Sequence, residues 1–305
     1  MHPQTQESPR RRTAPLNGSP PNQPGPLPCP HQSHTMNQTC EPQLTPSEIG
    51  PYVPVNCQKS PCPALNALCN HGAYGMPRDG KNVHAFVLAR ALIEVYGLST
   101  FFAYTLAVGS ILGITKGWSL SLNLKDLCAL PIAHFAALVH VNPTQKGKFT
   151  DGRPSRFLLN DMFEKAGNPN DPNFNLDNWA RWRNIQEYKT VMVNGEMPEI
   201  QAGIAAGELA LFLQVFGDPA RQFSASRAVI DEFFGYEKLP DSWRPQRPPP
   251  AHRIGFRSTI HVGGDVREGM AKSACRNHTP PWVYLAFIIA GLGGIGYILH
   301  LVSFF

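Results

Sequence analysis

The 305-residue chain has few cysteines and no paired cysteine motif. Its seven cysteines are scattered, and an odd, unpatterned set fits a reducing compartment better than an oxidising one. Cys62 and Cys69 are separated by six residues, a spacing that matches no common zinc site. The cysteines therefore argue against a disulfide-stapled secreted domain and against a zinc module.

The chain also lacks a strong excess of charge and a secretory leader. Its 27 basic and 22 acidic residues give a net charge of +5. The small basic cluster at residues 10–12 lies among prolines and is expected to be solvated, so no nucleic-acid partner is predicted. No apolar core follows the charged residues at the start of the chain, so no secretory signal peptide is expected.

Composition divides the chain into four parts. Residues 1–50 are rich in proline and polar residues and are expected to form a disordered tail. Residues 51–250 have the composition of a folded domain, and residues 251–281 are expected to be a polar linker.

Residues 282–305 are predicted to form a transmembrane helix. They contain no acidic or basic side chain apart from His300, and about 20 apolar residues suffice to cross a bilayer. Lys272 and Arg276 precede the segment, so we expect a C-terminal anchor with the folded domain on the cytosolic side. The alternative is a buried C-terminal helix of a soluble domain, which normally carries a polar stripe.

The most informative segment surrounds Cys62. Pro63 suits the first turn of a helix, and His71-Gly72 suits its end, so a helix is expected to start directly after Cys62. The free N–H groups at such a helix start lower the pKa of a thiol, and a thiolate is a good axial ligand for haem iron. The alternative is a buried structural cysteine, the common fate of a free thiol.

Residues 61–72 read P-C-P-A-L-N-A-L-C-N-H-G and are followed by P-R-D-G at residues 77–80. This pattern resembles the proximal motif of the fungal haem-thiolate peroxidases, the family of chloroperoxidases and unspecific peroxygenases, also called haem haloperoxidases. The resemblance extends over about residues 51–247 and implies a mainly α, single all-helical peroxidase domain. It also implies haem b with Cys62 as the iron ligand, and Pro63, Asn66 and Phe135 as further haem-binding residues. The loop before Pro77 is about two residues longer than in the family pattern and is expected to bulge.

Apolar periodicity predicts several helices in the body of the chain. Residues 83–96 show an amphipathic pattern that Gly97 ends. Residues 99–114 are apolar all round but short for a membrane span, so we expect a buried helix that walls the haem pocket, with a second membrane segment as the alternative. Residues 179–188 are also expected to be helical, and residues 228–243 resemble the family's closing helix and its L-P-D/E-x-W/F ending.

Glu208 is the candidate distal acid–base. It is the only charged residue between Glu199 and Asp218, in a segment of small and apolar residues that is predicted to be a helix. A carboxyl group is costly to bury unless it is protonated or hydrogen-bonded, and a peroxidase needs such a group beside the haem. The resemblance puts the distal glutamate here, but the family's nearby arginine falls on Gln201. The alternative is a surface or capping carboxylate.

His134 is the candidate distal histidine. Residues 131–138 resemble the family's I-E-H-D-x-S-L segment, in which oxygen ligands hold a cation beside the haem. Apolar residues replace all of these ligands here, at Ala133, Phe135 and Ala137, so an additional magnesium or manganese site is expected to be absent. A rival alignment on residues 149–156 keeps Asp151 and a serine but loses the glutamate and the histidine.

These features together predict a membrane-anchored enzyme. We expect a peroxidase or peroxygenase that uses hydrogen peroxide to oxidise or oxygenate a small apolar organic substrate, or a halide. An aromatic pocket, for which Phe101, Phe102, Phe135 and Phe212 are the candidates, favours an organic substrate. The alternative is a non-catalytic, membrane-tethered protein that binds haem.

Overall fold

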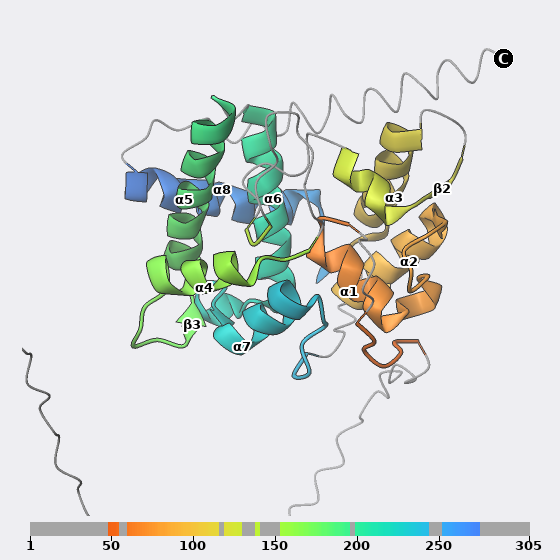
Figure 1. Ribbon diagram of the computed structural model, residues 1–305, viewed down its shortest axis with the longest axis horizontal. Coiled ribbons are helices and arrows are strands. Elements are labelled where there is room, and N and C mark those ends of the chain that lie inside the picture. The colour runs from red at the N-terminus through yellow and green to blue at the C-terminus, as the bar shows by residue number, and fades with distance from the viewer. Residues whose placement is uncertain are drawn as a thin grey trace, which may run out of the picture. The chain divides into compact units, whose positions relative to one another are not determined.

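Helices make up nearly all of the regular structure in the computed structural model (Figure 1). The structure describes residues 48–54, 60–115, 119–129, 138–140, 153–195, 199–243 and 252–274, all within the unit that begins at Leu44. The predicted tail, apart from residues 48–50, and the predicted span at residues 282–305 lie outside these ranges. Over the described ranges, no helix is both long enough and apolar enough to cross a membrane.

The elements follow one another along the chain as helices with two short strand pairs between them. The helices are α1 (Pro63–His71), α2 (Ala85–Tyr96), α3 (Thr100–Thr115), α4 (Arg156–Lys165), α5 (Leu176–Asn194), α6 (Glu199–Phe216), α7 (Arg227–Ile230) and α8 (Phe256–Ala274). Strand β1 (Val83–His84) pairs antiparallel with β2 (Ser121–Leu122), and β3 (Asn173–Phe174) with β4 (Ala225–Ser226). The mainly helical fold that the sequence predicts is therefore present.

The predicted start and end of the first helix are confirmed. Cys62 is the extended N-cap residue of α1, and Pro63 occupies the first turn. Gly72 ends the helix with φ of +58°, a left-handed conformation that a side chain disfavours. A Cβ atom on Gly72 would also lie only 3.3 Å from Nε of Arg78. Local chemistry therefore fixes where the cysteine sits.

Other helices differ from the sequence-based expectation. Helix α5 is longer than predicted because Asn175 and Asn178 form a capping box that starts it at Leu176. Helix α4 was not expected, and Ser155 caps it by accepting a hydrogen bond from N–H of Leu158 at 3.3 Å. Helix α8 occupies most of the described part of the expected linker. Its apolar residues follow a helical period, but glycine, threonine and charged residues separate them, so the segment is polar on average.

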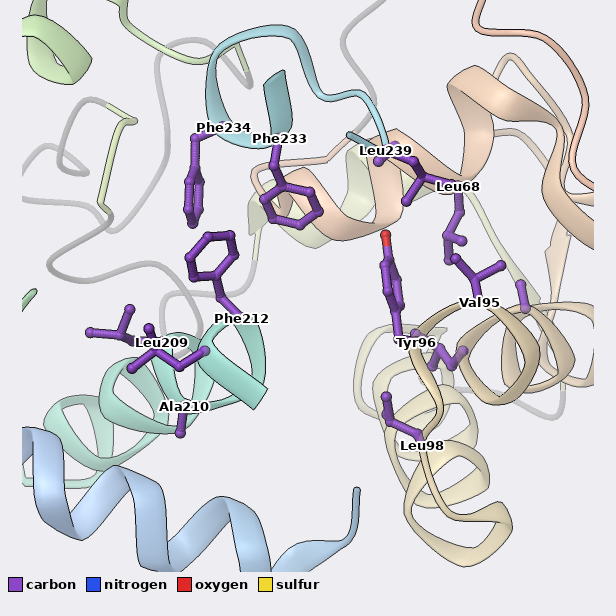
Figure 2. Close-up of a cluster of buried hydrophobic side chains, with 14 of the residues drawn as sticks. Leu68, Val95, Tyr96, Leu98, Leu209, Ala210, Phe212, Phe233, Phe234 and Leu239 are labelled. Carbon is purple, nitrogen blue, oxygen red and sulfur yellow. The ribbon is translucent and has the colours of Figure 1, made fainter. Parts of the chain in front are cut away.

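The packing of the helices brings distant segments together. Helix α8 packs across both α5 and α6, and α2 packs against α3 (Figure 1). Figure 2 shows Phe212 of α6 facing Phe233 and Phe234, which come from a π-helical turn at Asp231–Gly235. The ring centroids of Phe212 and Phe234 are 4.7 Å apart, and Trp179 of α5 adds a further ring at 5.3 Å from Phe212. This aromatic cluster fixes one side of the cavity described next.

Candidate active site

A cavity of about 600 Å³ lies among α1, α2, α3, α6 and α8. Its volume is in the range of pockets that bind small molecules and cofactors. Figure 2 shows Phe212 and Phe233 on one side of it and Tyr96 and Leu98 on the other. Most lining residues are apolar, and the described lining residues with ionisable side chains are Cys62, Tyr96, His140, Glu208 and Arg267.

Cys62 is in the cavity wall, at the start of α1. Burial in the cavity, reinforced by the negative charge of Glu208, raises the pKa of its thiol to about 12, although the backbone N–H groups of Leu65 and Ala64 act in the opposite direction. The expectation of a lowered thiol pKa was therefore wrong for the protein without a cofactor, because removal from water outweighs the effect of the helix start. A bound iron ion would reverse this, since a thiol that coordinates a metal is deprotonated.

The asparagines of the proximal motif hold α1 against the end of the domain. Asn66 is buried, and its Nδ2 donates to the carbonyl of Ser60 and to Oε1 of Glu237, each at 2.6 Å. Asn70 donates through Nδ2 to the carbonyl of Glu237 at 2.9 Å. Asn66 is not among the described residues that line the cavity, whereas Pro63 is. Of these two expected haem-binding residues, only Pro63 faces the cavity.

The histidine and arginine of the motif hold the other end of α1. Nδ1 of His71 donates to the carbonyl of Gly50 at 2.9 Å, and its Nε2 accepts a hydrogen bond from N–H of Leu239 at 3.3 Å. This pair of bonds requires the neutral imidazole, and burial lowers the pKa of His71 in agreement. Arg78 donates through Nη1 to the carbonyl of Asn70 at 2.6 Å. The motif therefore positions the cysteine through a hydrogen-bonded frame.

The two extra residues before Pro77 are accommodated in a short 3-10 turn. The turn spans Ala73–Gly75 and places Tyr74 at φ of +50°. The N–H of Tyr74 donates to the carbonyl of Glu48 at 2.8 Å, which ties the turn to the start of the described chain. The longer loop is thus folded into a turn that is hydrogen-bonded to the start of the described chain.

Glu208 is the only acidic side chain among the described lining residues. Glu208 is exposed, and it lies in the wall of the cavity, with the atoms of the domain packed around it. Its removal from bulk water raises the pKa of the carboxyl group to about 7, and the positive charge of Arg183 partly offsets this effect. A carboxyl group with such a pKa can both accept and return a proton near neutral pH.

Arg183 is the positive charge that the sequence did not reveal near Glu208. It is almost fully buried on α5, and burial lowers its pKa while the charges of Glu187 and Glu208 raise it. Because the family's arginine falls on Gln201 in the same helix as Glu208, its absence suggested that no arginine was near. The structure instead provides an arginine from a different helix. The available signal was its position directly after Trp182 and four residues after Trp179, two residues with large apolar side chains.

Among the described residues that line the cavity, one is a histidine, His140. Its segment is held in place because the carbonyl of Leu138 accepts from Nε1 of Trp182 at 2.9 Å, and the carbonyl of Val139 from N–H of Ser155 at 2.7 Å. The predicted distal histidine, His134, lies outside the described residues, as do Ala133, Phe135, Ala137 and Asp151. Within the described ranges, no cluster of three or more histidine, cysteine, aspartate or glutamate side chains could hold a metal ion.

The four phenylalanines proposed for the pocket have different positions. Phe102 and Phe212 line the cavity. Phe101 is 65% exposed and is not among the described lining residues, although its ring lies 5.9 Å from that of Phe256, which does line the cavity. Phe135 is outside the described residues. Helix α3 therefore walls the cavity with one face only, through Phe102, Leu106 and Ser110.

The cavity has the donor set that a haem-thiolate site requires, with one thiol and one carboxyl group in an apolar enclosure. The model of peroxidase family 2 matches residues 51–248, more than half of the chain. The chain belongs to peroxidase family 2. The peroxidase is accordingly an oxidoreductase, and the family relationship inferred from the proximal motif is confirmed. Its family implies a haem cofactor. No curated protein sequence gives a match to the peroxidase.

Proposed function

We propose that the peroxidase uses hydrogen peroxide to oxidise or oxygenate a small apolar organic compound, with Cys62 as the thiolate ligand of haem b and Glu208 as the distal acid–base. The observation that carries this proposal is that both side chains belong to the wall of one apolar cavity, although they are far apart in the sequence. Oxidation of a halide is the alternative reaction.

Cys62, Pro63 and the apolar side chains around them would hold the haem. A haem with a thiolate ligand supplies the oxidising chemistry, because electron density from the sulfur favours cleavage of the peroxide O–O bond. The backbone N–H groups of Ala64 and Leu65 stabilise the thiolate form of Cys62. The frame of Asn66 and His71 keeps that sulfur at the helix start.

Glu208 would move the proton. Its carboxylate form accepts a proton from hydrogen peroxide, and its carboxylic acid form returns this proton to the departing oxygen, which leaves as water. A pKa of about 7 keeps both forms populated near neutral pH. Arg183 stabilises the carboxylate through its charge and thereby keeps the pKa of Glu208 from rising further.

An organic substrate is favoured over a halide by the cavity wall. Phe102, Phe212 and Phe233 line it together with leucine side chains, and an apolar surface gains free energy by covering apolar ligand atoms. A small anion gains nothing from these apolar side chains, and Arg267 is the one permanently cationic side chain among the described lining residues.

Peroxide turnover by Glu208→Gln tests the proposal. We expect kcat for a phenolic substrate to fall about 10²- to 10⁴-fold, the usual contribution of a general acid–base. Glu164→Gln is the matched control, because Glu164 is exposed on α4 and outside the cavity wall. Equal turnover by Glu208→Gln and the control would disprove the role of Glu208.

A histidine is expected to orient Glu208, and two residues are candidates. His134 is favoured by the resemblance, and His140 by its place in the cavity wall. The single variants His134→Ala and His140→Ala separate them, since only loss of the orienting histidine should lower kcat while haem content stays the same. If neither variant lowers kcat, no histidine orients the acid–base.

We further propose, from the sequence, that residues 282–305 anchor the peroxidase in a membrane with the catalytic domain in the cytosol. Their apolar composition is the support for this proposal. Alkaline carbonate extraction of the full chain and of a chain that ends at Pro281 tests it. The full chain should stay with the membranes and the shortened chain should be released. Release of both would rule out the anchor.

A further inference from the structure

Helix α8 contributes a wall of the cavity although it follows the residues that match the family. Its lining residues recur at intervals of three and four, so they form one continuous face of the helix. They are Phe256, Thr259, Ile260, Gly263, Gly264 and Arg267. The cavity is therefore closed on this side by a helix that the family model does not include.

Glycines dominate the region where α6 and α8 approach each other. Gly203 and Gly207 of α6 and Gly263 and Gly264 of α8 all line the cavity. A glycine inside a helix destabilises it relative to alanine, so four such positions need a physical reason.

Close packing explains one of these glycines but not two of the others. A Cβ atom on Gly263 would lie 3.8 Å from the carbonyl oxygen of Ala206 and 3.9 Å from Cβ of Ala210, so Gly263 lies at the crossing of the two helices. A Cβ atom on Gly207 or Gly264 would meet no atom within 4 Å. Neither has a positive φ, so no backbone conformation requires glycine there. Their effect is to leave space in the cavity.

That space is beside the proposed acid–base. Gly207 immediately precedes Glu208 on α6, and Gly264 lines the same cavity from α8. Ile260 and Phe256 continue the wall with apolar surface. An apolar ligand group would fit the part of this space that Ile260 and Phe256 border, and on the α6 side Gly207 is the chain neighbour of the residue that handles the proton.

We propose that Gly207 and Gly264 form a substrate subsite that admits a bulky apolar ring system, and that α8 thereby sets the upper size limit of the substrate. This inference rests on the proposed function, because it assumes that the cavity holds haem and substrate together. A side chain at position 264 should exclude a large ring compound and leave a small one nearly unaffected.

Ligand binding to the haem-loaded peroxidase tests this inference without turnover. Pyrene and benzene serve as the large and small probes, and the shift of the haem absorption band on titration gives each Kd. We expect Gly264→Leu to raise the Kd of pyrene by about 10-fold or more, as added methyl and methylene groups do in an apolar pocket. The Kd of benzene should change less than about 3-fold on the same reasoning. Gly264→Ala, which favours the helix, should give an intermediate effect on pyrene.

Gly109→Leu is the matched control. Gly109 is also a helical glycine with no atom within 4 Å of an added Cβ, but it is not among the cavity-lining residues. It should leave both Kd values unchanged. An unchanged Kd of pyrene in Gly264→Leu and Gly264→Ala would overturn the inference. Loss of haem from Gly264→Leu at normal folding would also overturn it, because the space would then belong to the haem. Failure of the proposed function is seen separately, as unchanged turnover in Glu208→Gln.

Discussion

The pH dependence of peroxide turnover follows from the environment of Glu208. Its pKa is raised to about 7, mainly because the cavity removes the carboxyl group from bulk water. With this pKa, the carboxylate fraction is about 90% at pH 8, about 10% at pH 6 and about 1% at pH 5. A carboxyl group with an ordinary pKa would still be mostly ionised at pH 5. The rate of the step in which Glu208 accepts a proton should therefore fall about tenfold for each pH unit below 6.

The assay is kcat/KM for hydrogen peroxide, measured from pH 5 to pH 9 with circular dichroism as a check on folding. Glu208→Gln should show a lower value with no such decline, because an amide does not titrate. Arg183→Gln should move the decline to higher pH, because the charge of Arg183 lowers the pKa of Glu208 in the wild type. A wild-type profile that is flat between pH 5 and pH 8, or an equal decline in Glu208→Gln, would refute this reasoning.

Three further predictions concern stability and can be checked by urea or thermal unfolding. Asn66→Ala should lower the free energy of unfolding by about 1–3 kcal/mol, because it leaves the carbonyl of buried Ser60 and the half-buried carboxylate of Glu237 without their donor. Asn170→Ala, at an exposed position, should have little effect. Burial lowers the pKa of His71, so the contribution of its neutral imidazole to the free energy of unfolding is complete above about pH 6.5 and is lost as pH falls. His71→Gln should therefore lose less stability than the wild type on acidification. The pKa of Glu208 is raised, so the contribution of its carboxylic acid form to the free energy of unfolding is complete below about pH 4.5 and is lost as pH rises through about 7. The stability of Glu208→Gln should therefore rise relative to that of the wild type between pH 5 and pH 8.

Local sequence signals predicted the parts of the fold that depend on local chemistry. Pro63 and Gly72 set the ends of α1, and Gly97 ends α2 in a left-handed conformation with φ of +69°. These residues act on their own backbone, so a single sequence suffices to interpret them. Helix α8 was missed for a different reason, because it lies in a segment that is polar on average and contains Gly263 and Gly264, so the composition suggested a linker.

The candidate site shows the same division between local and tertiary effects. The isolation of Glu208 in an apolar helix was visible in the sequence, and the structure places it in a cavity with Cys62. The raised pKa of the Cys62 thiol was not predictable, because it depends on how other helices exclude water from the sulfur. The nearness of Arg183 to Glu208 was equally hidden, since it results from the packing of α5 beside the cavity.

The absorption spectrum of the ferrous carbon monoxide complex tests the central claim, that Cys62 is the haem ligand, most directly. The wild type and Cys69→Ala, a control for a buried cysteine in the same helix, should both show the red-shifted Soret band of thiolate ligation. Cys62→Ala should lose that band. A wild type without the red shift, or a Cys62→Ala protein that retains it, would contradict the assignment of Cys62.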